Sequence, residues 1–413
     1  MGILTTLIIV ILVISFMTFV TFFGRLPALR RTPIAGLHRL IWVHIPAALY
    51  YVDQKLTSGR VTSLTVKFFN CMMFDRHPTV VIFFLVIFGA GEVLFIPAAW
   101  PIVSLFIKFT IVVLAPTPFF TLYKACAADP GYITPENHAY HMSLYPYDFT
   151  LFHPGRLCKT CNLIKPPRSK HCSICKRCIA RADHHCIFIN SCVGYGNHHW
   201  FVLLLLSSAV VTSYATFLGL SILSEFQKSI YPEWSVWRPS GMSWNTYFSI
   251  WALGIRGYTR IGSVTLLTML TSPLIWGLLA YTTYLIYCGT TTNETLKWSE
   301  WKEDMRDGYA FARSLPSNRQ RQLYAEPTWT RWPVQPDRIM VTTSHGQPPN
   351  SAQQIPGEGP WEKMTSLSDV TNLYDLGFWD NLRDIFLSEP FGEREPVSER
   401  ERPRHRNGGG HPP

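Results

Sequence analysis

The stretch CKTCNLIKPPRSKHCSICKRCIARADHHCIFINSCVG, residues 158–194, decides the fold of this chain. Seven of the ten cysteines of the protein lie in it, many at two-residue gaps and interleaved with histidines. A Cys-x-x-Cys pair in a tight turn brings two thiolates to one tetrahedral ion, and this spacing is typical of zinc ligands. The stretch therefore predicts a zinc-stabilised unit.

The ligand count leaves one thiol over. Two tetrahedral zinc ions need eight ligands, which six cysteines and two histidines would supply. The candidate for the remaining thiol is Cys186, because it follows Asp183-His184-His185. A thiol beside a histidine that a carboxylate can orient has the arrangement of an activated nucleophile. The alternative is that His184 is a further metal ligand or a structural histidine.

The composition indicates a membrane protein. Of its 413 residues, 47% are hydrophobic and only 15% are charged, against roughly 25% charged in an average soluble protein. The formal net charge of +10 suits a surface that faces anionic lipid or a phosphate-bearing ligand. Clustered thiols indicate the reducing, cytosolic side of the membrane. The long apolar segments argue against nucleic-acid binding, the other common role of a basic zinc protein.

Five apolar segments are long enough to cross a bilayer, which takes about 20 residues. They are residues 2–23, 79–98, 102–123, 201–223 and 265–287. The first is predicted to be a retained anchor, because it lacks the basic start and the cleavage site of a signal peptide. The bases that follow it, Arg25, Arg30 and Arg31, predict a lumenal N-terminus by the positive-inside rule. Residues 40–51 are expected to be interfacial or re-entrant, and 248–255 are too short to cross.

These observations divide the chain into seven parts. We expect an N-terminal membrane anchor (1–23), a cytosolic basic loop (24–78), the second and third spans (79–123), a cytosolic cysteine-rich domain (124–200), the fourth and fifth spans with a lumenal loop (201–287), a cytosolic C-terminal region (288–390) and a disordered tail (391–413). The tail is rich in Arg, Glu, Pro and Gly, a composition that buries too little apolar surface to fold.

The cysteine-rich stretch resembles the DHHC domain of integral membrane protein S-acyltransferases, the palmitoyltransferases. The shared elements include Cys158-x-x-Cys161, Lys165-Pro166-x-Arg168, His171-Cys172-x-x-Cys175-x-x-Cys178, Asp183-His184-His185-Cys186 and Asn190-x-Cys192-Val193-Gly194. Two flanking family motifs are also matched, by Asp129-Pro130-Gly131 and by Thr291-Thr292-x-Glu294. Tyr374 and Asn381 resemble its C-terminal motif.

The chain departs from the family pattern after the DHHC run. Ile187-Phe188 stand where most members have Pro-Trp, and Ser191 replaces the commoner Asn. In having an aliphatic residue at 187, the chain is similar to a fungal branch of the family, whose members acylate SNAREs and other membrane proteins in the endoplasmic reticulum. The departures keep every candidate ligand and catalytic residue, so they bear on branch and substrate more than on chemistry.

The resemblance implies an all-α multi-pass membrane protein, a transmembrane helix bundle with a small cytosolic cysteine-rich domain. It also implies two structural zinc ions as cofactors. Their ligands would be Cys158, Cys161, His171 and Cys178 for one ion, and Cys172, Cys175, His185 and Cys192 for the other. Cys186 would be the nucleophile, His184 its base, and Asp183 the residue that orients His184.

The implied reaction moves a long-chain acyl group from palmitoyl-CoA, through acyl-Cys186, to cysteines of membrane proteins. The basic residues Arg168, Lys170, Arg177 and Arg181 are candidates for contact with the CoA phosphates, and the alternative is that they attract anionic lipid headgroups. The expected partners are palmitoyl-CoA, the lipid bilayer and membrane proteins with juxtamembrane cysteines such as SNAREs, and no nucleic acid. The expected location is the endoplasmic reticulum membrane, with the catalytic domain facing the cytosol. The alternative is a non-catalytic, membrane-anchored zinc-binding interaction module.

Overall fold

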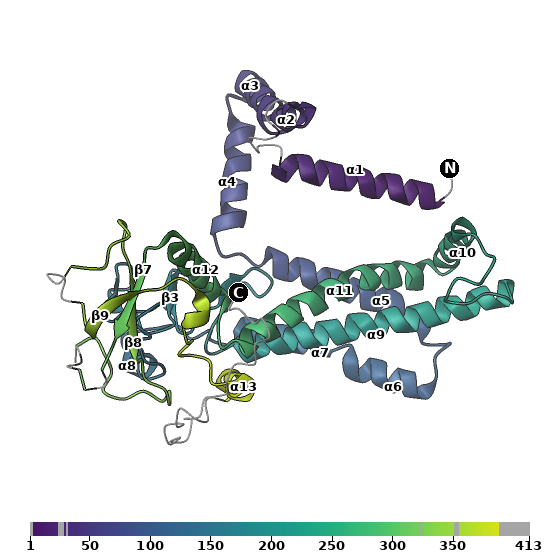
Figure 1. The fold of residues 1–413 in the computed structure, drawn as a ribbon. Helices are drawn as coiled ribbons and strands as arrows, with labels where there is room; N and C mark the ends of the chain where they lie inside the picture. The colour runs from purple at the N-terminus through teal and green to yellow at the C-terminus, as the bar shows by residue number, and fades with distance from the viewer. Residues whose placement is uncertain are drawn as a thin grey trace. The chain divides into compact units, whose positions relative to one another are not determined.

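The computed structural model describes residues 3–23, 29, 32–316, 318–319, 321, 324–350 and 355–387. Arg25, Arg30, Arg31 and the predicted disordered tail, 391–413, lie outside the described residues. The described chain divides into two compact units, and Figure 1 shows the elements of both. The first unit holds residues 1–77, 87–111 and 212–271, and the second holds 78–86, 112–211 and 272–413.

Four helices in the described part of the chain are long and apolar enough to cross a membrane: Thr79–Ala99, Leu105–Ala127, His198–Ile230 and Thr259–Tyr287. They coincide with four of the five predicted spans, and the prediction of a multi-pass helical membrane protein is confirmed. The second of them is divided into α6 (Leu105–Leu114) and α7 (Thr117–Ala127), with Pro116 at the break and Pro118 in the first turn of α7. Proline removes a helical N–H, so this division is expected there.

The remaining predicted span, residues 2–23, contains helix α1 (Ile3–Phe23), which carries no charged residue. Its crossing of the membrane stays a prediction. The following region is helical, with α2 (Pro33–Arg39), the π-helix η2 (Leu40–His44), α3 (Ile45–Thr57) and α4 (Arg60–Phe74). The segment 40–51, expected to be interfacial or re-entrant, therefore forms η2 and the first part of α3.

The core of the first unit lies where α5 (Thr79–Ala99), α9 (His198–Ile230) and α11 (Thr259–Tyr287) meet. Phe95, Leu218 and Ile261 are buried together there. Gly219 allows the close approach of α9 and α11, because a Cβ at that position would collide with the side chain of Thr265. Helix α10 (Trp244–Gly257), which includes the short apolar run 248–255, begins at Ser243, whose hydroxyl caps the N–H of Thr246.

The cysteine-rich part of the second unit consists of three antiparallel hairpins. They pair β1 (Leu157–Cys158) with β2 (Leu163–Ile164), β3 (Lys170–Cys172) with β4 (Arg177–Ile179), and β5 (His184–Cys186) with β6 (Ser191–Val193). Their turns use left-handed backbone at residues that carry a side chain, including Asn162, Lys176 and Asn190. The short helix α8 (His138–Met142) precedes them.

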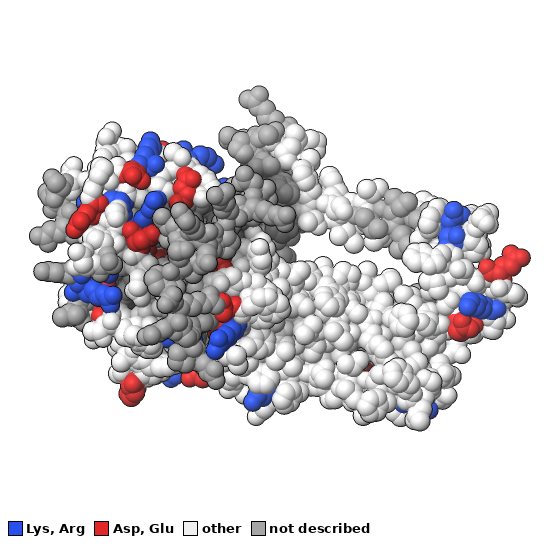
Figure 2. Space-filling view, turned by 60° about the horizontal axis from the view of Figure 1, so that its bottom comes forward, with Lys and Arg blue, Asp and Glu red and all other residues white. Residues whose placement is uncertain are grey.

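The C-terminal region adds a sheet that sequence analysis did not predict. It has the strand order β8-β7-β9, with β7 (Ala310–Ser314) antiparallel to both β8 (Arg338–Thr342) and β9 (Glu358–Lys363). Around it lie α12 (Thr292–Asp307), the 3-10 helix η3 (Leu367–Asp369) and α13 (Phe378–Phe386). On the face shown in Figure 2, charged side chains gather over the part of the chain that holds this sheet.

An aromatic core stabilises the second unit. Trp332 is 2% exposed and Tyr145 and Tyr374 are each 1% exposed. The rings of Trp332 and Tyr145 lie 5.1 Å apart, and those of Tyr145 and Tyr374 lie 6.0 Å apart, edge to face. The indole N–H of Trp332 donates to the carbonyl of Leu373 at 2.9 Å, so the polar group of this buried ring is satisfied.

Replacing Trp332 by alanine is expected to destabilise the second unit by about 3–5 kcal/mol, because it empties a buried aromatic site. Thermal unfolding of the detergent-solubilised protein would measure the change. The matched control is Trp379→Ala, since Trp379 is 76% exposed and its loss should change stability by less than about 0.5 kcal/mol. Equal melting temperatures for the two variants would contradict the assignment of this core.

Candidate functional site

Two clusters of cysteine and histidine lie in the hairpins. One contains Cys158, Cys161, His171 and Cys178, and the other contains Cys172, Cys175, His185 and Cys192. Within each cluster the potential ligand atoms all lie within 4.8 Å of one another. The sets are the ones that the family resemblance implied, and each group could hold a metal ion.

The spacing of the ligand atoms fits zinc. The Nδ1 atom of His171 lies 3.5, 3.3 and 3.8 Å from the sulfurs of Cys158, Cys161 and Cys178. The Nδ1 atom of His185 lies 3.4 to 3.7 Å from the three sulfurs of its cluster. A tetrahedral zinc ion with Zn–S near about 2.3 Å and Zn–N near about 2.0 Å separates its S and N ligands by about 3.5 Å. The donor type and the distances therefore agree with zinc.

The strand register explains how each cluster is assembled. His171 pairs with Cys178 across β3 and β4, and His185 pairs with Cys192 across β5 and β6. Residues opposite one another in an antiparallel pair have side chains on the same face. Each cross-strand pair meets a Cys-x-x-Cys turn from the preceding hairpin, so the two clusters link three hairpins in series.

The same register separates His185 from its neighbours. Side chains alternate between the two faces of a strand, so His184 and Cys186 share the face opposite His185. Cys186 interacts with the imidazole of His184. The alternation thus places His185 in a ligand cluster and its neighbour His184 beside the thiol of Cys186.

Asp183 orients His184. Its Oδ2 atom lies 2.6 Å from Nδ1 of His184. The same carboxylate accepts hydrogen bonds from the backbone N–H of Thr292 at 2.6 Å and from its hydroxyl at 3.0 Å. Burial opposes the ionised carboxylate, but the hydrogen bonds from His184 and Thr292 outweigh it and hold the pKa of Asp183 well below its ordinary value.

The imidazole of His184 is favoured in its charged form. Burial alone would lower its pKa, yet the hydrogen bonds and charges of Asp183 and Cys186 outweigh burial and raise the pKa of His184 to about 10. Its ring also contacts Phe201 edge to face, with centroids 5.4 Å apart.

The thiol lies in an apolar environment at the ends of membrane helices. Cys186 is 7% exposed and packs in a cluster with Leu122 and Ala125 of α7, Leu279 of α11, and residues of α9 that include Phe201 and Leu204. The next two residues, Ile187 and Phe188, are about half exposed, at 50% and 52%. The predicted catalytic residues Asp183, His184 and Cys186 are therefore brought together next to apolar helix surface.

The four basic residues predicted to contact CoA occupy two different environments. Lys170 and Arg177 are exposed. Arg168 and Arg181 are each 3% exposed. Arg168 donates two hydrogen bonds of 2.7 Å to the carboxylate of Glu294 and one of 3.0 Å to the carbonyl of Gly289. Arg181 donates to Asp384 at 2.7 Å.

Thr292 and Glu294 belong to the start of α12. Thr291 and Glu294 form a capping box, in which the Thr291 hydroxyl accepts from the Glu294 N–H and the Glu294 carboxylate accepts from the Thr291 N–H. The first turn of α12 therefore supports Asp183 through Thr292 and Arg168 through Glu294. Sequence analysis matched this segment to a family motif but did not assign Thr292 a contact with Asp183.

The comparisons with known proteins agree with the geometry. A family model described as DHHC palmitoyltransferase matches residues 151–299. The chain is 49% identical over 424 residues to Palmitoyltransferase SWF1 of Neurospora crassa, covering 98% of each chain. It is 42% identical over 403 residues to Palmitoyltransferase swf1 of Emericella nidulans, covering 94% of this chain and 97% of the relative.

The chain belongs to the DHHC palmitoyltransferase family. The predicted family and the predicted enzyme class, a protein S-palmitoyltransferase, are confirmed with it. The mouse protein Palmitoyltransferase ZDHHC4 is 32% identical over 189 residues, which cover 44% of this chain and 53% of that protein. The DHHC match at 151–299 contains both metal clusters, Thr292 and Glu294, while Asp384 lies beyond it.

We expect the purified protein to contain two zinc ions per chain, and mass spectrometry of the metal content would count them. Cys178→Ser and Cys192→Ser each remove one ligand from a different cluster, so each should lower the count to about one. Cys71→Ser is the matched control, because Cys71 is exposed and belongs to neither cluster. A count that stays at two in both cluster variants would contradict the assignment of the ligands.

Proposed function

We propose that this membrane enzyme transfers a long-chain acyl group from acyl-CoA to cysteines of membrane proteins, through an acyl-Cys186 intermediate. The observation that carries the proposal is the position of Cys186. Its thiol shares a strand face with His184, which is held by Asp183, and it packs against the ends of α7, α9 and α11. The proposed nucleophile and its proposed acid–base partner therefore lie next to apolar helix surface, which suits a lipid chain.

In the first half-reaction the Cys186 thiolate attacks the carbonyl carbon of the acyl-CoA thioester. A new C–S bond forms, the bond to the CoA sulfur breaks, and the leaving CoA thiolate takes the proton held on His184. Asp183 fixes the imidazole through Nδ1, which leaves Nε2 to carry this proton. The raised pKa of His184 favours the protonated imidazole with which the cycle begins.

In the second half-reaction the cysteine of the acceptor protein gives its proton to the neutral His184. Its thiolate attacks acyl-Cys186, the acyl group moves to the acceptor, and the Cys186 thiolate leaves beside the restored imidazolium. This sequence is ping-pong chemistry. Burial of the chain among apolar residues favours a long acyl group, because each buried methylene contributes about 0.8 kcal/mol.

The metal clusters have a structural role in this proposal. Zinc held by three thiolates and one imidazole has no open position, so it supplies folding energy and no reacting group. Bound there, it would fix the hairpin β5–β6, on which His184 and Cys186 lie. The two ligand sets use all cysteines of the stretch except Cys186.

The exposed bases are the better candidates for the phosphates of CoA. We assign this contact to Lys170 and Arg177, whose side chains face solvent. Arg168 and Arg181 are buried and already paired with Glu294 and Asp384. A buried guanidinium that leaves its carboxylate would pay a large desolvation cost, so these two are assigned a structural part instead.

The acceptor proteins are proposed to carry their cysteines next to a membrane span, as SNAREs do. Cys186 packs against the ends of membrane helices, so an acceptor thiol reaches it most directly from the bilayer surface. We also propose the endoplasmic reticulum membrane as the location, with the hairpins in the cytosol and the N-terminus in the lumen. The thiol-rich hairpins favour the reducing side of the membrane.

Incubation with labelled palmitoyl-CoA should place a hydroxylamine-sensitive label on the wild-type protein. Cys186→Ala should reduce this label at least about a hundredfold, because it removes the nucleophile. Cys126→Ala is the matched control, since Cys126 packs against the same apolar cluster and should leave the label unchanged. Equal labelling of Cys186→Ala and wild type would refute the intermediate. A two-zinc protein that takes no label would favour a non-catalytic interaction module.

Thr292→Val removes the hydroxyl that donates to Asp183 and keeps the backbone donor. We expect the rate of acyl-enzyme formation to fall about tenfold, the effect of losing one hydrogen bond to a charged group. Thr295→Val is the matched control one turn along α12, because the Thr295 hydroxyl donates only to the carbonyl of Thr291 among the described residues. Single-turnover kinetics would give both rates, and equal rates would exclude a part for Thr292.

A further inference from the structure

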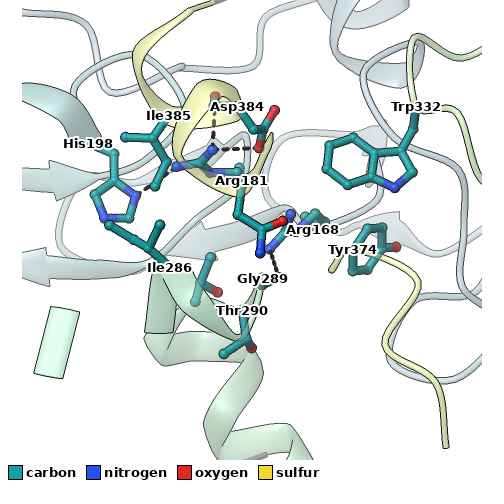
Figure 3. A pocket seen from close by; sticks show the side chains of 12 residues that line it. Arg168, Arg181, His198, Ile286, Gly289, Thr290, Trp332, Tyr374, Asp384 and Ile385 are labelled. Atoms are coloured by element: carbon teal, nitrogen blue, oxygen red, sulfur yellow. Dashed lines mark hydrogen bonds and ion pairs between the residues drawn. The ribbon is translucent and has the colours of Figure 1, made fainter. Parts of the chain in front are cut away.

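A small pocket lies between the hairpins and the C-terminal segments. Its lining includes Arg168, Arg181, His198, Tyr374 and Asp384. Its volume is about 20 Å³, space for about one water, so neither an acyl chain nor CoA fits there. Figure 3 shows Arg181 at this point between Asp384 and His198. Charged side chains meet at this pocket, and Arg181, Arg331 and Asp384 form the junction.

Asp384 of α13 is the shared acceptor of this junction, and it is 4% exposed. Its Oδ2 atom accepts from Arg181 Nη1 at 2.7 Å and from the hydroxyl of Tyr145 at 2.6 Å. Its Oδ1 atom accepts from Arg331 Nη2, and its backbone carbonyl accepts from Arg181 at 3.2 Å. One carboxylate therefore forms ion pairs with two buried guanidinium groups.

Arg181 connects this carboxylate to the segment that carries Asp183 and His184. It stands two residues before Asp183, in left-handed backbone with φ of 41°. Its other terminal nitrogen, Nη2, lies 2.8 Å from Nδ1 of His198. The neighbouring peptide is held as well, because Ala182 N–H donates to the carbonyl of Arg168. A residue other than glycine keeps this backbone conformation only where the surrounding structure enforces it.

We infer that Asp384 is a positioning residue for acyl transfer. By pairing with Arg181, it fixes the positions of Asp183 and His184. The inference rests on the proposed transfer through Cys186. Without the carboxylate, two guanidinium groups would share a buried space with no counter-charge, and Arg181 would have to move. Because Arg181 and Asp183 are two residues apart, that movement displaces the carboxylate that orients His184.

The test separates this role from general support of the fold. Asp384→Asn removes the charge, and Asp384→Asn/Arg331→Met also removes one of the two cations, which restores the charge balance of the junction. Arg331→Met alone is the matched control, because it deletes a partner of the same carboxylate and leaves Arg181 paired. Arg181→Lys provides a second route, since a lysine keeps the charge but cannot reach Asp384 and His198 together.

The measurements are the maximal rate of acyl-enzyme formation, the palmitoyl-CoA concentration that gives half this rate, and the zinc content. We expect Asp384→Asn, the double variant and Arg181→Lys to lose about tenfold or more in maximal rate. The half-saturating concentration should stay within about twofold, and the two zinc ions should remain. Arg331→Met should keep the wild-type rate, since it leaves the link to Asp183 intact.

Wild-type rates in the double variant and in Arg181→Lys would overturn the inference, and so would an equal loss in Arg331→Met. A change confined to the half-saturating concentration would also overturn it, because that result assigns the junction to CoA binding. In each of these cases Cys186→Ala still abolishes the label and the proposed transfer stands. Label retained in Cys186→Ala would instead overturn the transfer, and the inference with it.

Discussion

The cross-strand pairs His171–Cys178 and His185–Cys192 are the constraint on which the rest of the site depends. Two-stranded hairpins of this length are marginal in water by themselves. A metal ion bound by each pair and by the preceding Cys-x-x-Cys turn would join them, and structural zinc contributes folding energy outright. The period of two along β5 then assigns His185 to the cluster and His184 with Cys186 to the other face.

A second set of constraints comes from buried ion pairs between segments far apart in the chain. Arg168 pairs with Glu294 and stacks over the rings of Tyr145 and Tyr374, at 5.1 and 4.5 Å. Arg181 pairs with Asp384. Burial opposes the ionised form of Asp384, yet Arg181 and Arg331 outweigh it and lower the pKa of this carboxyl group. Such pairs are costly to break once buried. Both act on the residues before Asp183, since Arg181 stands two positions earlier and the carbonyl of Arg168 accepts from the N–H of Ala182.

The sequence predicted the features that depend on local spacing. The two ligand sets, the orientation of His184 by Asp183 and the four long apolar spans all follow from residues close together in the chain or from a known motif. Arg168 and Arg181 show where this approach ends. In the sequence they are two bases of a strongly basic stretch, but their acidic partners stand 126 and 203 residues later. The three-stranded sheet was missed for a similar reason, because β8 and β9 flank a Ser/Pro/Gln/Gly-rich segment that resembles a linker.

The distance along the chain between Arg181 and Asp384 has a consequence for biosynthesis. The ribosome makes the hairpins first, and every cysteine of the two clusters is available before α12 is translated. The carboxylate at 384 is made 203 residues after Arg181, beyond α11 and the aromatic segment around Tyr374. The loop that leads to Cys186 therefore acquires this counter-charge only after the ribosome has made α11, the last of the four long apolar helices in the described part of the chain.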